Sequence, residues 1–216
     1  MYILRLKLDL HIHSIYSKDS SNTIEVIFDR IRKLGLDGFA LADHDTIEGI
    51  PRALSKKDDI IFIPALEISA KGAHILALDP VEIIPAGLGI VETVELIQEQ
   101  GSVALLAHPY GFPRSWVKPE TVENAGFDAI EVANSAQFPY KLILEKNLKL
   151  AEKLGLPQTG GSDSHIPSTI GNAYTIIESS SREINDILDA IIEGKTTWYG
   201  TSISIIQRIK KYLPKR

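Results

Sequence analysis

All six histidines of this 216-residue chain lie in short segments that look like metal-ligand motifs. They are His11 and His13 in DLHIHS, His44 in LADHDT, His74 in GAHIL, His108 in LLAHPYG and His165 in GGSDSHIP. Acidic residues lie beside or near most of them: Asp9, Asp19, Asp43, Asp45, Glu67 and Asp163. Neutral imidazole and carboxylate are ligands that zinc, manganese and iron prefer. The sequence therefore predicts a metalloenzyme.

The spacing of several of these residues favours a shared site. His11 and His13 are two apart in a predicted strand, so both side chains point to one face and can reach the same ion. Asp163 and His165 repeat that spacing. Glu67 ends the apolar run FIPALE, where a charge is costly unless it is paired. One histidine alone is more often a core or surface residue than a ligand, but six at the ends of predicted strands indicate a metal site.

The absence of cysteine limits what can hold the metal. Without thiolates, any ion must be held by nitrogen and oxygen, and no disulfide framework is available. No apolar run reaches the roughly 18 residues of a membrane span. The start, MYILRLKLDL, is too short and too strand-like for a signal peptide. We therefore expect a cytoplasmic protein that does not enter a membrane.

The net charge of −5 gives no general attraction to nucleic acid. The one basic cluster is the C-terminal QRIKKYLPKR, which an amphipathic closing helix with a solvated basic face explains adequately. An RNA contact is the alternative explanation. Nucleic acid stays open as a partner but is not favoured.

Strand-like apolar runs alternate with amphipathic segments from end to end. The expected strands are residues 6–11, 38–42, 60–66, 73–78, 103–107, 129–132, 174–177 and 196–199. The expected helices are residues 24–34, 91–100, 140–154 and 183–192. Asn22 or Thr23 can cap the first helix, and Gly35 can end it. This rhythm favours a mainly parallel sheet with crossover helices, as an open doubly wound sheet or as a closed barrel.

The positions of the candidate ligands decide between these two architectures. They follow strands spread over the whole chain, and a barrel gathers the C-terminal ends of its strands around one mouth. We therefore expect an α/β barrel with the metal site at that mouth. The length of 216 residues fits a seven-stranded or distorted barrel better than eight full βα units. No linker or repeat divides residues 1–216, which we expect to form one domain.

The order of these motifs resembles that of the PHP (polymerase and histidinol phosphatase) family. DLHIHSIYSKDS, LADHDT, the glutamate of ALEIS, GAHIL, AHP and GSDSH follow in the family's order from residue 7 to about residue 171. The resemblance implies a distorted seven-stranded, TIM-like (βα) barrel. It also implies two or three divalent metal ions at the mouth: manganese, zinc or iron.

The resemblance assigns ligands to three metals. These are His11, His13, Glu67 and Asp163 for the first, a bridging Glu67 with His74 and His108 for the second, and Asp19, His44 and His165 for the third. Many relatives have a histidine where this chain has Asp19. A carboxylate there makes the third site harder and more anionic, which would favour manganese or iron over zinc.

Further residues have expected roles around such a centre. Asp43 and Asp45, together with Asp9, could orient imidazole N–H groups. Turn or strand-edge chemistry explains Asp9 and Asp45 equally well. On the loop after His108, Arg114 could grip a second phosphate, although an ordinary surface charge is the alternative.

Aromatic and polar residues could complete the substrate site. Tyr110, Phe112 and Trp116 lie on the loop after the AHP motif and could stack on a base or pack the loop down. Asn134 and Ser135 follow a predicted strand and could line the mouth or form a turn.

Clustered divalent ions predict phosphoester hydrolysis, because a metal-bound hydroxide is available near neutral pH and the ions offset the charge of the phosphate. We expect a metal-dependent phosphoesterase that acts on a small phosphorylated metabolite or nucleotide. Only 33 residues separate His74 from His108, so no inserted domain covers the site. An exonuclease on RNA or single-stranded DNA is the first alternative. Histidinol phosphatase and a non-catalytic accessory module are the others.

Overall fold

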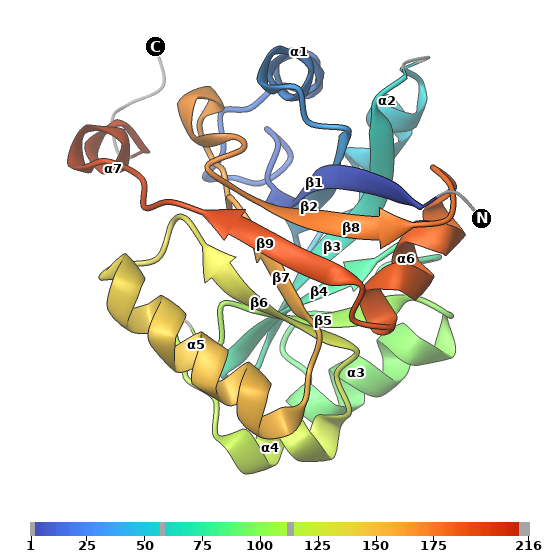
Figure 1. The fold of residues 1–216 in the computed structure, drawn as a ribbon, viewed down its shortest axis with the longest axis vertical. Coiled ribbons are helices and arrows are strands. Elements are labelled where there is room, and N and C mark those ends of the chain that lie inside the picture. The colour runs from blue at the N-terminus through green and yellow to red at the C-terminus, as the bar shows by residue number, and fades with distance from the viewer. Residues whose placement is uncertain (1–2, 57–58, 112–114, 212–216) are drawn as a thin grey trace.

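The computed structural model describes residues 3–56, 59–111 and 115–211. In these residues nine strands form one sheet, with the order β7-β6-β5-β4-β3-β2-β1-β8-β9. The strands are β1 (Leu4–Ile12), β2 (Gly38–His44), β3 (Ile61–Ala70), β4 (Ala73–Leu78), β5 (Val103–Ala107), β6 (Ala129–Asn134), β7 (Gln158–Gly161), β8 (Ala173–Ser179) and β9 (Thr196–Gly200). The sheet curls until its edges approach each other, which makes it a nearly closed barrel (Figure 1).

Helices surround this sheet. In the described part of the chain they are α1 (Ile24–Leu34), α2 (Ile50–Leu54), α3 (Ile90–Glu99), α4 (Pro119–Ala125), α5 (Tyr140–Leu154), α6 (Ile184–Ile192) and α7 (Ile205–Lys211). Figure 1 shows α3, α4 and α5 on one side of the sheet and α1 on the other. The four helices expected from the sequence correspond to α1, α3, α5 and α6. Within the described residues, no helix is long and apolar enough to cross a membrane.

Helix α1 illustrates how the sequence sets these boundaries. The Thr23 hydroxyl accepts a hydrogen bond from the N–H of Val26 at 3.2 Å, which satisfies a donor that the helix itself cannot pair. Gly35 ends the helix with φ 65°, a left-handed conformation that glycine adopts without steric cost. The predicted cap and end of this helix are therefore confirmed.

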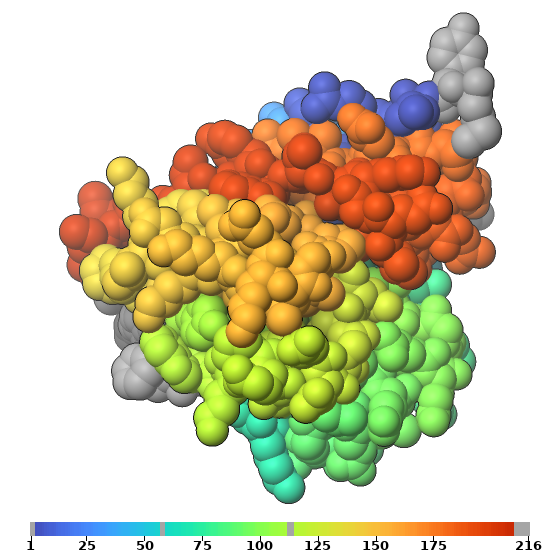
Figure 2. Space-filling view, turned by 60° about the horizontal axis from the view of Figure 1, so that its bottom comes forward, coloured from blue at the N-terminus to red at the C-terminus, as the bar shows by residue number. Residues whose placement is uncertain are grey.

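Side chains join the two edges of the sheet. The Thr196 hydroxyl in β9 donates to the Gln158 carbonyl in β7 at 2.8 Å, and the indole N–H of Trp198 donates to the Gln158 side chain at 3.2 Å. The Thr175 hydroxyl in β8 bonds both the N–H and the carbonyl of Gly160, each at 2.9 Å. In the space-filling view of Figure 2, the orange-red C-terminal segment lies beside the gold residues of α5.

The barrel differs from the expected seven-stranded, mainly parallel one. Strands β1 to β3 and β5 to β7 run parallel, but β4, β8 and β9 pair antiparallel with their neighbours. Strands β3 and β4 are joined by a two-residue turn at Lys71 and Gly72, so the chain reverses without a crossover helix. Strand β7 has the sequence QTGG, which lacks the alternation of apolar residues that would predict a strand. The sheet is therefore a mixed one of nine strands.

Alternate residues of successive strands fill the inside of the barrel. In β3 these are Ile61, Ile63 and Ala65, and neighbouring strands contribute Ala40, Ala42, Leu76, Leu78, Val103 and Leu105. Helix α6 adds Ile187, Leu188 and Ile191 to the same buried cluster. The opposite faces of the strands pack against the outer helices, as Phe39 of β2 does against Phe28 of α1, with ring centroids 5.1 Å apart.

Candidate metal centre

The alternation that fills the barrel also positions the candidate ligands. Along β3 the inward residues are Ile61, Ile63 and Ala65, and the next residue with the same orientation is Glu67. In β2 the inward series ends at His44, and in β4 it begins at His74. Because side chains repeat every two residues in a strand, the apolar interior gives way to ligands at one end of the barrel.

A bulge in β1 turns two histidines toward this cluster. The pairing of β1 with β2 shifts register between Asp9 and Ile12. Leu10 belongs to the inner cluster whereas Ile12 packs outside with α1, although the two are only two residues apart. The bulge therefore reverses the alternation, and His11 and His13 face the barrel interior.

Glu67 lies at the middle of the site and is 1% exposed. Its carboxylate contacts five of the six imidazoles. Oε1 lies 2.8 Å from His74 Nδ1 and 3.0 Å from His108 Nε2. Oε2 lies 2.8 Å from His44 Nδ1, 3.3 Å from His13 Nε2 and 3.4 Å from His11 Nε2. The two oxygens of one carboxylate thus face different groups of histidines.

Two aspartates complete the cluster. Asp163 Oδ1 lies 3.2 Å from His13 Nε2 and 3.4 Å from His165 Nδ1. Asp19 Oδ2 lies 3.1 Å from His165 Nε2, and its Oδ1 lies 3.8 Å from His44 Nε2. The structure therefore brings together the members of each ligand set that the family resemblance implies.

The buried polar atoms of the cluster fit a set of metal ions. Among the described residues, six such atoms have no hydrogen-bond partner: Nε2 of His11, His13, His44 and His165, Oδ1 of Asp19 and Oε2 of Glu67. Four groups of three ligand atoms lie within 4.8 Å of one another: His13, His44 and His165; His11, His13 and Asp163; His11, Glu67 and His108; and His44, Glu67 and His74. Buried lone pairs without a partner are costly, and divalent ions would satisfy them.

The electrostatics keep the central carboxylate ionised. Burial alone would raise the pKa of Glu67, but the rings of His11, His44 and His74 together hold it well below its usual range. The pKa of Asp19 is also lowered, since contacts with His165 outweigh its partial burial. These carboxylates are therefore available as anionic ligands.

Glu131 supports two of the histidines, and the sequence reasoning missed it. Its Oε1 lies 3.0 Å from His11 Nδ1, and its Oε2 accepts from the backbone N–H of His108 at 3.1 Å and from Asn134 Nδ2 at 2.9 Å. The one signal in the sequence was a glutamate inside the apolar strand AIEVAN, buried like Glu67. A carboxylate that accepts a hydrogen bond from the second ring nitrogen fixes the orientation of an imidazole ligand.

The predicted orienting aspartates bind backbone and hydroxyl groups instead of imidazoles. Asp43 accepts from the N–H and hydroxyl of Ser14 at 2.6 Å each and from the Ser17 hydroxyl at 2.7 Å. Ser17 in turn lies 3.3 Å from His13 Nδ1, so Asp43 reaches the histidine only through Ser17. Asp45, at φ 52°, accepts from the N–H of Ser69 at 2.7 Å, in keeping with turn chemistry.

Asp9 likewise holds backbone. It accepts from the N–H groups of Ser162 at 2.8 Å, Gly171 at 2.9 Å and His11 at 3.3 Å. Burial raises its pKa to about 6 even though these hydrogen bonds act in the opposite direction. Asp9 thus ties β1 to the segment that carries Asp163.

Ser115, on the loop after β5, contacts two histidines of the site. The Ser115 hydroxyl is buried, accepts from the N–H of His74 at 3.3 Å and lies 3.5 Å from His108 Nδ1. Asn134 also lies in the site, where it donates to Asp163 Oδ2 at 3.3 Å, whereas the Ser135 hydroxyl bonds the carbonyl of Ser162. The predicted substrate residues Phe112 and Arg114 lie outside the described residues.

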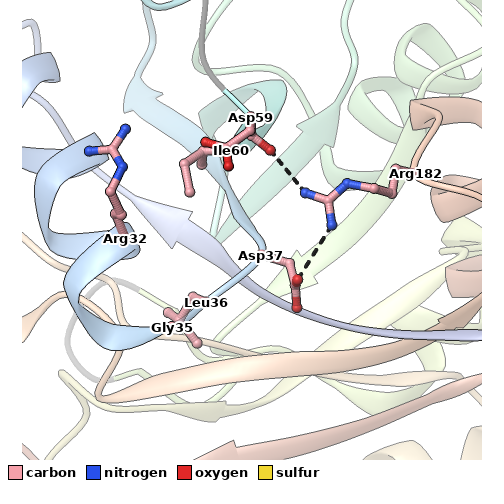
Figure 3. A pocket seen from close by; sticks show the side chains of 7 residues that line it. All are labelled: Arg32, Gly35, Leu36, Asp37, Asp59, Ile60 and Arg182. Atoms are coloured by element: carbon pink, nitrogen blue, oxygen red, sulfur yellow. Dashed lines mark hydrogen bonds and ion pairs between the residues drawn. The ribbon is translucent and has the colours of Figure 1, made fainter.

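A hollow lies near the N-terminal ends of β2 and β3, whereas the histidines lie near the C-terminal ends of these strands. It is lined by Arg32, Asp37, Asp59 and Arg182 among others (Figure 3). Arg182 donates to Asp37 Oδ1 at 3.4 Å and to the Asp59 carbonyl at 2.9 Å. These contacts occupy the guanidinium of Arg182. We therefore interpret Arg182 as a structural link between the segments that carry Asp37 and Asp59, and not as a ligand-binding group.

Comparison with known proteins agrees with the fold and the cluster. A family model described as PHP-associated matches residues 144–196. An uncharacterised protein of Methanocaldococcus jannaschii is 32% identical over 175 residues, which span 78% of this chain and 69% of that protein. A probable phosphatase of Proteus mirabilis is 26% identical over 79% of this chain and 83% of its own length. A 5′-3′ exoribonuclease of Haemophilus influenzae is 31% identical over 46% of this chain and 38% of its own length.

A solved structure has the same fold. The two-domain protein from Bacteroides vulgatus, described as containing a predicted PHP-like metal-dependent phosphoesterase, superposes with a TM-score of 0.71 at 21% identity. The match covers 92% of this chain and 65% of the Bacteroides protein. The barrel thus has the fold of a PHP-like protein. The motif resemblance is confirmed: the chain belongs to the PHP family.

Proposed function

We propose that residues 1–216 form one PHP-type domain that hydrolyses a phosphate ester of a small metabolite or nucleotide. The observation that carries this proposal is the position of Glu67. Its Oε1 faces His74 and His108, and its Oε2 faces three further histidines, so one carboxylate can bridge two ions. The ligand sets implied by the family resemblance have the distances given above, and the name of the Proteus relative supports a phosphatase.

Two or three divalent ions would be held by these residues. When bound, they would supply Lewis acidity, which acidifies water and offsets the negative charge of a phosphate ester. Asp19 gives the third ligand set a hard oxygen donor, so manganese or iron suits that set better than zinc.

Neighbouring side chains hold the histidines of the centre in position. Glu131 holds His11 through its ring nitrogen and His108 through its backbone, and Ser115 contacts both His74 and His108. Such partners fix ring orientation before substrate arrives, which is the arrangement that efficient metal sites require.

Phosphate release by the manganese-loaded protein tests this function. The substrates are nucleoside monophosphates, nucleoside 3′,5′-bisphosphates, histidinol phosphate and a short 5′-phosphorylated RNA. We expect Glu67→Gln to lower turnover on the order of 100-fold or more and to reduce the number of bound ions. Glu92→Gln, an exposed exchange of the same kind on α3, is the matched control. Turnover that persists in a metal-quantified Glu67→Gln sample would exclude the bridging role.

The same panel separates the alternatives. Release from histidinol phosphate alone would identify a histidinol phosphatase, and bound metal without release from any substrate would favour a non-catalytic module. An exonuclease is the second candidate, because a groove with aromatic and basic side chains includes Trp116, the residue after Ser115. The Haemophilus relative, named as an exoribonuclease, supports that candidate.

A further inference from the structure

A groove of about 470 Å³ lies between helix α5 and the loop that follows β5. Two aromatic rings and four lysines contribute to its lining: Tyr110, Trp116, Lys118, Lys146, Lys149 and Lys153. This groove lies outside the histidine cluster, and Tyr110, Val117 and Leu150 of its lining pack on the core between the sheet and the outer helices. In a chain of net charge −5, its four lysines make the groove locally basic.

The aromatic pair forms a fixed and accessible platform. The rings of Tyr110 and Trp116 meet edge to face, with centroids 5.2 Å apart. Lys146 Nζ lies 4.5 Å from the Trp116 centroid and holds the indole from one side. Trp116 nevertheless stays 57% exposed. A planar ligand can therefore stack on it without displacing protein.

The lysines continue this platform along α5. Lys146, Lys149 and Lys153 follow the i, i+3, i+7 spacing of one helix face, a run of about 10 Å at 1.5 Å per residue. That length matches about three stacked nucleotides at ~3.4 Å each. None of the four groove lysines forms an ion pair with a carboxylate of the described residues. Burial, together with the charge of Glu120, raises the pKa of the Tyr110 hydroxyl.

The groove and the metal centre share neighbouring residues of the chain. Trp116 follows Ser115, whose hydroxyl contacts His74 and His108, and the N–H of Trp116 donates to the Gly72 carbonyl at 3.4 Å. Tyr110 is two residues from His108. The platform is therefore next to residues of the centre along the chain, and the lysines continue from it along α5.

We propose that this groove binds the part of a single-stranded nucleic acid that extends from the phosphate held at the metal centre. One base stacks on Trp116, and Lys146, Lys149 and Lys153 pair with successive backbone phosphates. Aromatic platforms beside basic tracks are the means by which proteins bind single strands without reading their sequence. An acidic peptide would use the lysines but would leave the exposed indole without a planar partner. This proposal deepens the phosphoesterase function proposed above and depends on it for the position of the scissile phosphate.

Binding of a fluorescent oligonucleotide tests the groove without requiring turnover. The probe is a 5′-phosphorylated RNA of about eight nucleotides with fluorescein at its 3′ end, titrated with full-length protein in a chelating buffer. We expect Trp116→Ala to weaken the Kd about 5- to 150-fold, the value of one base–aromatic stack. Trp116→Phe should restore most of the affinity because it restores a ring. Tyr199→Ala, an exposed aromatic exchange on β9, should bind like the wild type.

The contribution of the lysines is tested separately, by the salt dependence of the Kd. Changing Lys149 and Lys153 together to Gln should lower the slope of log Kd against log salt concentration by about 1.4, since each phosphate contact on a single strand contributes about 0.7. The double exchange of Lys7 and Lys33 to Gln removes two exposed charges elsewhere and should leave the slope unchanged.

The outcomes separate the groove from the phosphoesterase. If wild-type protein releases phosphate from small esters while the groove variants bind RNA normally, the groove proposal is wrong and the function stands. If wild-type protein releases phosphate from no substrate while the variants lose RNA binding as described, the groove stands without the phosphoesterase. Competition by a polyglutamate peptide as strong as by unlabelled RNA, with Trp116→Ala neutral, would assign the groove to acidic peptides and overturn the proposal.

Discussion

Replacing Glu131 by glutamine should weaken metal binding by changing the tautomer of His11. A carboxylate can only accept, so the 3.0 Å contact with Glu131 Oε1 keeps the proton of the imidazole on Nδ1. His11 Nε2 then keeps its lone pair, and this atom points toward Glu67 Oε2 at 3.4 Å and Asp163 Oδ1 at 3.9 Å. The wild-type carboxylate thus prepares His11 as a ligand.

The size of the effect follows from the donors around Glu131. Its Oε2 accepts from the N–H of His108 and from Asn134 Nδ2, and two unpaired buried donors would cost about 1–3 kcal/mol each. The oxygen of the glutamine amide therefore takes that side, and its NH₂ group faces His11 Nδ1. The ring must now accept at Nδ1 and carry its proton on Nε2, where it blocks coordination. We expect metal affinity to fall roughly 10–100-fold, or about 1.4–2.8 kcal/mol.

Isothermal titration of manganese into chelator-treated protein measures this change. Glu178→Gln, a half-exposed carboxylate on β8, is the control and should titrate like the wild type. Nitrogen-15 NMR of the histidine rings reports the tautomer directly. A Glu131→Gln affinity within twofold of the wild type, or a His11 ring that still carries its proton on Nδ1, would refute the reasoning.

Three further predictions concern the metals and the packing around them. Asp19→His should shift the preference of the third ligand set from manganese toward zinc, because a nitrogen donor replaces a hard oxygen; competitive metal binding followed by elemental analysis measures the ratio, and an unchanged ratio would contradict the role of Asp19. Removing metal with a chelator should lower the Tm by about 5–11 °C, since an ion at 100 times its Kd contributes about 2.7 kcal/mol; calorimetry with and without manganese checks this, and equal Tm values would argue against ions held in the folded state. Gly161→Ala should cost about 1–3 kcal/mol of unfolding free energy, because the new Cβ would collide with His11 Cβ and lie 2.7 Å from Glu131 Oε1; urea unfolding measures it, with Gly89→Ala as a control whose Cβ meets open space and whose φ, like that of Gly161, lies outside the left-handed region.

The parts of the site that a strand pattern determines could be predicted from the sequence. Glu67 and His44 end runs of alternate inward residues, so their type and position together indicated a buried cluster. The same reasoning applies to Glu131, yet its partners are His11 and His108 on other strands. Such contacts between strands depend on how the strands are aligned with one another, and the sequence of one strand alone does not determine that register.

The shape of the barrel was harder to predict. Strand β7 carries two glycines in four residues, and it is a strand because β6 pairs with it and Thr175 of β8 bonds it. The roles of Asp9 and Asp43 depend on loops that fold back from distant positions, such as Ser162 for Asp9 and Ser17 for Asp43. Local propensity contains no information about these contacts.

The candidate ligands come from both ends of the chain, and this has a consequence for assembly. His11 and His13 lie in or just after β1, whereas Asp163 follows β7, so an ion held by these three residues closes a loop of roughly 150 residues. Such an ion would act as a reversible cross-link between the first strand and the segment that follows the seventh. With the ligands proposed here, a chain that has not yet joined its first strand to the segment after its seventh has no complete centre, so metal uptake would report that this part of the fold has closed.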